Sequence, residues 1–86
     1  MEKIRILLVD DDRQNSEFLR KFLEVEGYEV SYAENGGKGW EAFSAIRPDL
    51  VLFVVNMPVL NGLRSAQLIR EQDRDVLIFF LTDRTE

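Results

Sequence analysis

Residues 50–55 read Leu50-Val51-Leu52-Phe53-Val54-Val55, six apolar side chains in succession with no polar residue among them. A strand with one face in water alternates polar and apolar residues, whereas a strand buried on both faces does not need to. Pro48 stands just before this run and stops a preceding helix from continuing into it. We therefore predict a central strand, in a sheet that is covered on both sides.

Three further segments have the character of strands. Residues 4–9 are short and mostly apolar, and they stop at Asp10-Asp11-Asp12. Residues 28–33 alternate polar with apolar side chains, which is typical of a strand with one wetter face near a sheet edge. Residues 76–81 are apolar throughout. Four strands are therefore predicted along the chain.

Helical patterns separate these strands. Residues 13–26 have the periodicity of an amphipathic helix, with Asp12 as its N-cap and Gly27 in the left-handed position that ends it. Residues 38–46 and 63–72 predict two shorter helices, while residues 35–37 and 61–62 are predicted to form turns. The apolar residues assigned to the first helix are Phe18, Leu19, Phe22, Leu23 and Val25.

The order β-α-β-α-β-α-β predicts an α/β fold with a doubly wound parallel sheet, because right-handed crossovers place helices on both faces. Ligands of such sheets bind outside the carboxyl ends of the strands. Those ends carry Asp10, Asp11, Asn56 and Thr82. We expect the functional site there.

The composition excludes several classes of function. Cys and His are both absent, which rules out disulfide scaffolds, thiolate or imidazole metal sites and Ser-His or Cys nucleophile systems. A formal charge of −5 and the lack of a long basic run argue against direct nucleic-acid binding. The longest apolar runs are far shorter than the ~20 residues that span a bilayer. We expect one small cytoplasmic domain.

The three acids after the first strand have two interpretations. Clustered carboxylates with neutral oxygen donors are the ligands of a hard divalent cation such as Mg²⁺. The alternative is that Asp10, Asp11 and Asp12 cap the following helix, whose N-terminal dipole favours negative charge. A cap needs only one acid, so both interpretations remain open.

Several motifs together resemble the receiver domain of response regulators in two-component signalling. They are Ile6-Leu7-Leu8-Val9-Asp10-Asp11-Asp12, Pro48-Asp49-Leu50-Val51-Leu52, Asn56-Met57-Pro58-Val59-Leu60-Asn61-Gly62 and Leu81-Thr82. The resemblance implies a flavodoxin-like sheet in the order 2-1-3-4-5. It also implies an Asp at the end of the third strand, which accepts phosphate from a histidine kinase with Mg²⁺ bound.

The resemblance assigns roles to individual residues. Asp11 corresponds to the direct Mg²⁺ ligand, Asp10 to its outer-sphere partner, the main-chain carbonyl of Asn56 to a third ligand, and Thr82 to the switch hydroxyl. The phosphoacceptor corresponds to Val54, which has no nucleophile. We therefore expect a non-enzymatic receiver-like module that is not phosphorylated at this position and binds Mg²⁺ weakly, if at all.

The resemblance also implies that residues 1–86 form a partial receiver domain. The chain stops at Glu86, before the fourth helix, fifth strand and fifth helix of the family, which leaves four strands in the order 2-1-3-4 and three helices. The fourth strand would then be an apolar sheet edge, and such an edge favours self-association. Asp83 is a further departure, because the family usually has a small residue after the Thr.

Three functions remain open. The first is an interaction module that binds a histidine kinase-like or output protein without receiving phosphate. The second is a truncated or engineered half-fold that self-associates. The third is a phosphoacceptor that uses another acid.

Overall fold

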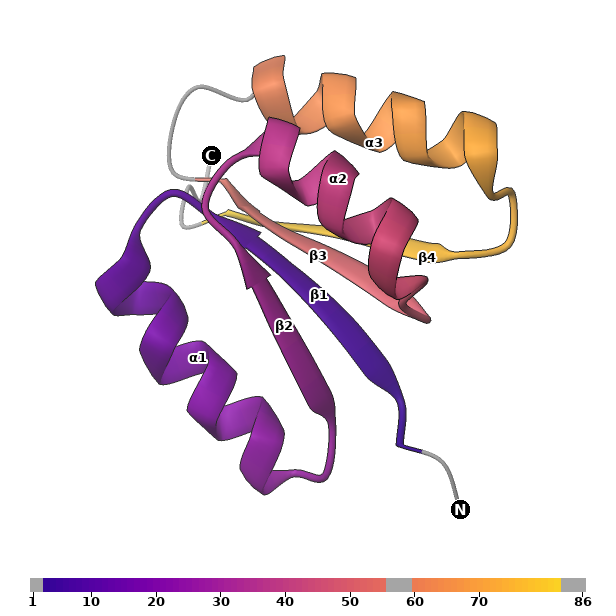
Figure 1. The fold of residues 1–86 in the computed structure, drawn as a ribbon. Helices are drawn as coiled ribbons and strands as arrows, with labels where there is room; N and C mark the ends of the chain where they lie inside the picture. The colour runs from indigo at the N-terminus through magenta and orange to yellow at the C-terminus, as the bar shows by residue number, and fades with distance from the viewer. Residues whose placement is uncertain (1–2, 56–59, 83–86) are drawn as a thin grey trace.

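The computed structural model describes residues 3–55 and 60–82, and the predicted alternation of strands and helices is confirmed (Figure 1). The elements are β1 (Arg5–Asp10), α1 (Arg13–Val25), β2 (Glu29–Ala33), α2 (Gly36–Ile46), β3 (Leu50–Val55), α3 (Leu60–Gln72) and β4 (Leu77–Thr82). Most predicted boundaries lie within one or two residues of these. The third helix begins three residues earlier than predicted.

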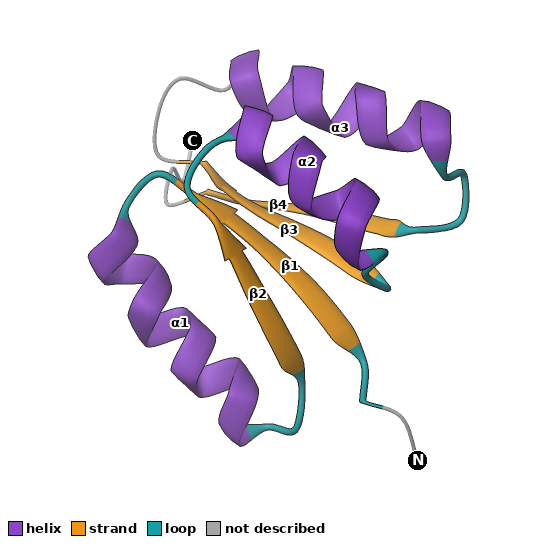
Figure 2. Ribbon diagram, viewed as in Figure 1, coloured by secondary structure: helices purple, strands orange, loops and turns teal. Residues whose placement is uncertain are grey.

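All the strand pairs are parallel, and the sheet order is β2-β1-β3-β4. Helix α1 lies on one face of the sheet, and α2 and α3 lie on the other (Figure 2). The described residues thus form the predicted doubly wound, flavodoxin-like α/β fold, with four strands and three helices. The uninterrupted apolar strand β3 is central, as its sequence pattern indicates.

The main core lies between the sheet and the pair α2 and α3. Phe43 of α2 and Ile69 of α3 are fully buried there against inward-facing residues of β1 and β3. The ring of Trp40 stacks near that of Phe43, with 6.4 Å between their centroids. The buried members of this core are Leu7, Val9, Ala33, Phe43, Val51, Phe53, Ile69 and Val76.

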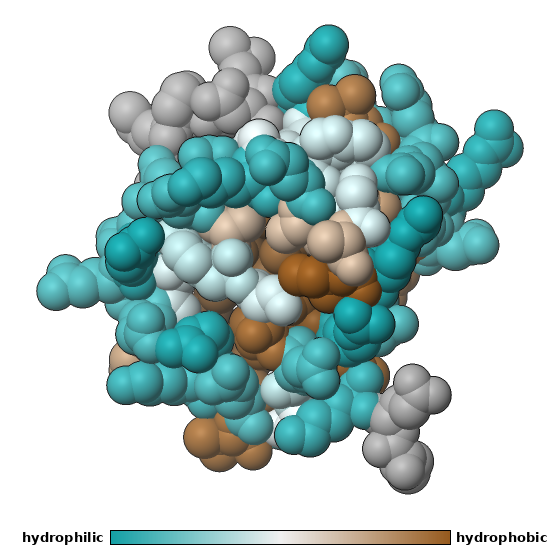
Figure 3. Space-filling model, viewed as in Figure 1, coloured by the Kyte–Doolittle hydropathy of each residue, from teal (hydrophilic) through white to brown (hydrophobic). Residues whose placement is uncertain are grey.

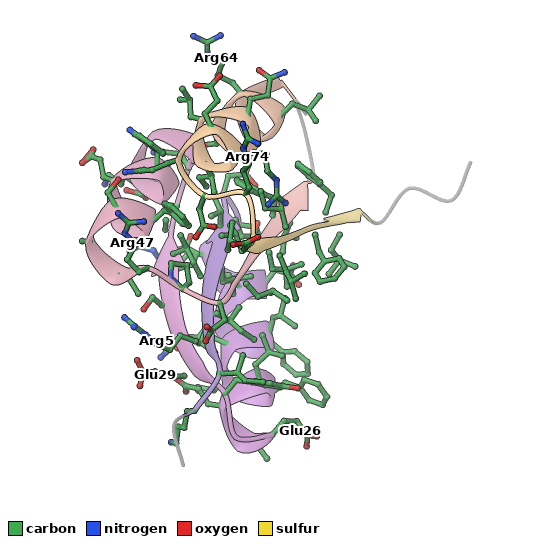
Figure 4. The ribbon with its side chains drawn as sticks, turned by 90° about the vertical axis from the view of Figure 1, so that its right-hand side faces the viewer. Arg5, Glu26, Glu29, Arg47, Arg64 and Arg74 are labelled. Carbon is green, nitrogen blue, oxygen red and sulfur yellow. The ribbon has the colours of Figure 1, made fainter. Side chains whose placement is uncertain are left out.

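Polar contacts hold the amino-terminal ends of the strands, at the end of the sheet opposite Asp10 and Val54. The Asp49 carboxylate accepts a hydrogen bond from the Arg5 main-chain N–H at 2.9 Å. The Arg5 side chain also lies 3.6 Å from the Glu29 carboxylate of β2 (Figure 4). Arg5 therefore contacts both β2 and the residue that precedes β3. These contacts support the register in which Arg5 faces Glu29 and Ile6 faces Leu50.

The predicted ends of α1 are confirmed. The Asp12 side chain accepts a hydrogen bond from the Asn15 main-chain N–H at 3.1 Å, as an N-cap does. Gly27 has φ +101°, the left-handed conformation that a side chain would strain.

The two predicted glycine turns are wrong. Gly36 and Gly37 form the first turn of α2, and Asn35 is its N-cap, accepting a hydrogen bond from the Lys38 main-chain N–H at 2.8 Å. Residues 61–62 lie within α3. The first error arises because Asn is equally suited to a turn and to an N-cap, and only the following backbone distinguishes them.

The apolar pattern of α1 is only partly used. Leu19 and Leu23 are half-buried, while Phe18, Phe22 and Val25 are exposed. Strand β4 is an edge of the sheet with exposed apolar side chains, as predicted. In the space-filling view, hydrophilic atoms cover most of the visible face and hydrophobic atoms gather near its centre (Figure 3).

Candidate functional site

The candidate site lies at the carboxyl ends of β1 and β3. In the register of these strands Asp10 faces Val54, so the last carboxylate of β1 and the apolar side chain of β3 are direct neighbours. Both are buried, Asp10 at 1% and Val54 at 9% exposure. A carboxylate and an apolar side chain therefore lie side by side at the carboxyl end of the sheet, where folds of this class bind ligands.

Hydrogen bonds hold the Asp10 backbone and carboxylate. Its Oδ1 accepts from the Asp12 main-chain N–H at 2.9 Å, which orders the turn between β1 and α1. Its main-chain carbonyl accepts from the Tyr32 hydroxyl at 2.6 Å, which ties the end of β1 to β2. Tyr32 is thus a positioning residue as well as the strand-packing residue that its sequence pattern indicates.

Burial raises the pKa of the Asp10 carboxyl above its ordinary value, because the charged form is desolvated. Hydrogen bonds from the Asp12 main chain and the Asn15 side chain act in the opposite direction, and the neighbouring charges of Asp11 and Asp12 raise the pKa further. The net effect is an increase. Asp10 is therefore a carboxylate whose charge opposes folding.

The structure separates the three consecutive acids. Asp12 caps α1, so the capping interpretation is confirmed for this residue. Asp10 is buried beneath the turn and Asp11 is exposed at its surface. Asp12 thus serves its helix, while Asp10 lies at the end of β1 and Asp11 in the turn that follows.

The described residues do not gather a cluster of acidic side chains at the predicted metal site. Within residues 3–55 and 60–82 no group of three or more acidic, His or Cys residues is placed to hold a metal ion. Mg²⁺ takes six oxygen ligands, usually one or two carboxylates together with several waters.

Two other predicted site residues are not fully described. Asn56, the predicted carbonyl ligand, lies outside the described residues, as does Asp83. For Thr82 the structure describes the backbone, which pairs with Val55 at the end of β4. The backbone thus brings residue 82 to the same carboxyl end of the sheet as Asp10 and Val54.

Sequence reasoning missed two contacts of Asp10. These come from the Tyr32 hydroxyl and the Asn15 side chain. Asn15 is the third residue after the cap, a position from which a polar side chain can reach back across the first helical turn. That spacing was the available signal, whereas the Tyr32 contact depends on the pairing of β1 with β2.

Comparison with known families identifies the family to which this fold belongs. The model of the response regulator receiver domain matches residues 6–86. The chain belongs to the response-regulator receiver family. The resemblance of its motifs to this family is therefore confirmed.

The curated relatives of this receiver chain include a transcriptional regulatory protein and a response regulator. It is 38% identical to the transcriptional regulatory protein RprY of Bacteroides fragilis over 98% of the chain and 36% of that protein. It is 41% identical to the response regulator MprA of Mycolicibacterium vanbaalenii over 94% of the chain and 35% of that protein. The chain spans about a third of the length of these relatives.

Solved receiver structures share the fold. The chemotaxis protein CheY4 of Vibrio cholerae superposes with a TM-score of 0.89 at 29% identity, over 99% of this chain and 72% of that one. The response regulator TrrA of Thermotoga maritima, in complex with Mg²⁺ and BeF, has a TM-score of 0.86 at 39% identity, over 98% and 72% of the two chains. In the described part of this receiver chain, no helix is long and apolar enough to cross a membrane.

Proposed function

We propose that this chain is a receiver-type interaction module of two-component signalling that does not accept phosphate at residue 54. The observation that carries the proposal is Val54, a buried hydrocarbon side chain in direct register with Asp10. By family resemblance this position belongs to the phosphoacceptor. An acyl phosphate forms only on a carboxylate, and valine has none.

The proposal includes a weakened affinity for Mg²⁺. The TrrA neighbour was solved with Mg²⁺ and BeF. In this chain the proposed ligands are Asp11 directly, Asp10 in the outer sphere and the Asn56 carbonyl, with Thr82 as the switch hydroxyl. When bound, Mg²⁺ would supply positive charge beside the carboxylates of Asp10 and Asp11. With Val54 in place of a third acid, the site has less negative charge to attract it.

The proposed partners are proteins. TrrA has also been solved in complex with the histidine kinase ThkA, and its chain is 39% identical to this one. This supports a histidine kinase-like or output protein as the partner here. The formal charge of −5 supports the prediction of no direct contact with nucleic acid. A non-catalytic role, a cytoplasmic location and a partial receiver domain over residues 1–86 complete the proposal.

Intact-mass measurement tests the central claim. The chain is incubated with Mg²⁺ and a small acyl phosphate, and the mass of one phosphoryl group is sought. We expect no addition to the wild-type chain. The Val54→Asp variant is the matched control, since it restores a carboxylate at the same register position. Phosphorylation of the wild-type chain would mean that another acid accepts phosphate, and it would contradict the proposal.

A second candidate is self-association through β4. The observation that favours it is the row of exposed apolar side chains on this edge strand, which includes Leu77, Phe79 and Leu81. An apolar strand without charges at a sheet edge is a template for pairing with another chain. Binding of a partner protein and binding of a second copy are separable by measuring the mass of the chain alone in solution.

A further inference from the structure

We propose that the hollow between α2 and α3 is a binding site for a small aromatic carboxylate. The two helices lie next to each other on one face of the sheet (Figure 1). The hollow between them has a volume of about 440 Å³, within the range of about 300–1,000 Å³ that small-molecule sites occupy. Neither Asp10 nor Val54 lines it, so binding there is independent of phosphate chemistry at residue 54.

A buried hydrogen bond closes the floor of the hollow. Ser65 of α3 is 2% exposed, and its hydroxyl donates to the main-chain carbonyl of Gly36 in the first turn of α2. Both residues line the hollow. A buried hydrogen bond is costly to leave unmade, so this contact holds the two helices at one spacing. The space between them is therefore formed before any ligand binds.

The walls of the hollow are apolar. Trp40 of α2 and Leu68 of α3 line it, and both are half-buried. The Trp40 ring packs against the main core and stacks near Phe43, with 6.4 Å between the centroids and 12° between the ring planes. A ring held in this way presents a fixed surface to a second flat ring, and such ring pairs add to affinity beyond the area that they bury. The walls thus favour an aromatic ligand.

The rim of the hollow carries positive charge. Arg64 is exposed there, and none of the ion pairs formed within residues 3–55 and 60–82 includes it. Asn35 is also exposed at the rim, and its Oδ1 accepts from the Lys38 main-chain N–H at 2.8 Å, which leaves its NH₂ group as a donor.

These donors suit a carboxylate. None of the described residues that line the hollow is acidic, although the whole chain has a formal charge of −5. The planar guanidinium of an arginine binds a carboxylate through two parallel hydrogen bonds. A ligand whose ring lies against Trp40 and whose carboxylate meets Arg64 would use both properties of the hollow.

Gly37 is consistent with a ligand in this place. A methyl group on Gly37 would meet only Asn35 Oδ1, at 3.4 Å, and Gly37 has no positive φ, so neither packing nor backbone conformation requires glycine here. Glycine within a helix is less favourable than alanine, and one reason to have it is the close approach of a ligand to the backbone. Gly37 lines the hollow, where its missing side chain leaves the entrance wide.

A second hollow, between α1 and β2, lacks these properties. It has a volume of about 350 Å³ and is lined by Arg13 and Arg20, which are ion-paired with Glu34 and Glu17 respectively. Glu17 lines this second hollow as well. Its cations are therefore already neutralised, and its acid would repel a carboxylate.

The shape of the proposed site is set by the described part of the chain. All of its lining residues lie between residues 35 and 68, on two helices that contact each other. Helix α2 contacts β1 and β2, whereas the chain continues beyond Thr82 from β4, at the other side of the sheet. The walls, floor and rim of the hollow thus come from α2, α3 and the cap of α2.

Two-dimensional ¹H–¹⁵N NMR tests the proposal, with benzoate as the probe. Trp40 is the single tryptophan of the chain, so its indole N–H gives one resonance that reports on this hollow. We expect benzoate to shift this resonance and the amide resonances of Gly37 and Ser65 saturably, with a dissociation constant of about 1 mM or lower. The absence of saturable shifts at about ten times that concentration would overturn the proposal.

Two matched molecules test the class of ligand. Benzamide has the shape of benzoate without its charge, and acetate has the carboxylate without the ring. Each should bind at least about tenfold more weakly than benzoate. Acetate binding as tightly as benzoate would show a general anion site, and benzamide binding as tightly would show that the charge is not recognised. Either result would contradict a site for aromatic carboxylates.

Substitution of Arg64 tests the role of the rim. Arg64→Gln should weaken benzoate binding about tenfold and leave benzamide binding unchanged. Arg74→Gln is the matched control, because Arg74 is also exposed and outside the ion pairs of the described residues but lies beyond the far end of α3 (Figure 4). Its benzoate affinity should equal that of the wild-type chain.

The ¹H–¹⁵N spectrum of each variant shows whether it is folded. Equal weakening by Arg64→Gln and Arg74→Gln would mean that benzoate responds only to the net charge of the chain. That result would overturn the assignment of the carboxylate to Arg64 and, with it, the proposed site.

Discussion

Gly39 of α2 lies directly over Val9 of β1, so closely that a methyl group on Gly39 would stand 3.0 Å from Val9 Cγ2 and 3.4 Å from Cγ1. Both residues are buried, and Val9 belongs to the main core. The absence of a side chain at residue 39 therefore sets how near α2 can approach the central part of the sheet.

Gly39→Ala should lower the free energy of unfolding by about 1 kcal/mol, because overpacking of the core outweighs the better helix propensity of alanine. Gly37→Ala is the control: its methyl group would meet only Asn35 Oδ1, at 3.4 Å, and should stabilise the chain by about 0.5–1 kcal/mol. Urea denaturation measures both. Equal stabilisation by the two substitutions would show that α2 can move away from Val9 at no cost.

Tyr32→Phe should cost about 1 kcal/mol of stability, because the variant loses the hydrogen bond from the Tyr32 hydroxyl to the Asp10 carbonyl at 2.6 Å. Tyr28→Phe is the matched control, since Tyr28 precedes β2 and does not reach this site. Urea denaturation of both variants gives the difference. If Tyr32→Phe and Tyr28→Phe are equally stable, the hydroxyl contact does not stabilise the end of β1.

Asp10 should make stability depend on pH in a specific direction. Because burial raises its pKa in the folded chain, the folded state retains the Asp10 proton to higher pH than the unfolded state. The contribution of Asp10 is thus most favourable below its ordinary pKa of 3.8, and it is lost as pH rises through the raised folded value. Asp10→Asn, which keeps an oxygen for the Asp12 N–H, should stabilise the chain at pH 7.

The control for this pH dependence is Asp11→Asn at the neighbouring exposed position. Denaturation curves from pH 3 to pH 8 should show that the gain from Asp10→Asn grows with pH, with a smaller gain from Asp11→Asn. A gain from Asp10→Asn that is the same at both ends of the range would contradict a raised pKa.

Val54→Asp should destabilise the chain without metal by about 2–3 kcal/mol, because it places a second carboxylate beside buried Asp10. Millimolar Mg²⁺ should recover part of this loss, since a cation neutralises the added charge. Val54→Asn is the control, because asparagine has nearly the shape of aspartate without its charge. The stability of Val54→Asn should not respond to Mg²⁺. Thermal unfolding with Mg²⁺ and with a chelator measures these effects.

The wild-type chain provides the reference for the metal experiment. We expect its midpoint of thermal unfolding to shift less with Mg²⁺ than that of Val54→Asp. A larger shift in the wild-type chain would mean that Asp10 and Asp11 suffice for binding, and the proposed weakening of the site would be wrong.

Much of the fold follows from local patterns. The unbroken apolar run 50–55 predicted a central strand, and the Asp12 cap and Gly27 predicted the ends of α1. These predictions succeed because burial on both faces, capping and positive φ are local requirements that particular residues meet. The start of α2 was wrong because Asn35-Gly36-Gly37 is suited to a turn as well as to a capped helix.

The contacts within the site were less accessible to prediction. Sequence alone located Asp10, Asp11 and Val54 at strand ends, and the registers of the strands then brought Asp10 beside both Val54 and Tyr32. The burial that raises the pKa of Asp10 is likewise a property of the surrounding elements, as is the exposure of Phe18 and Phe22. No local pattern contains this information.

The order of side chains along the chain by itself determined the alternation of strands and helices, the parallel sheet, and the absence of a carboxylate at residue 54. Backbone propensities and the chemical identity of each side chain are enough for these properties. The tertiary structure alone decided that Asp10 is desolvated, that Gly39 lies against Val9, and that the Tyr32 hydroxyl reaches the Asp10 carbonyl. These depend on distances between residues far apart in the sequence, which are set only when the helices pack on the sheet.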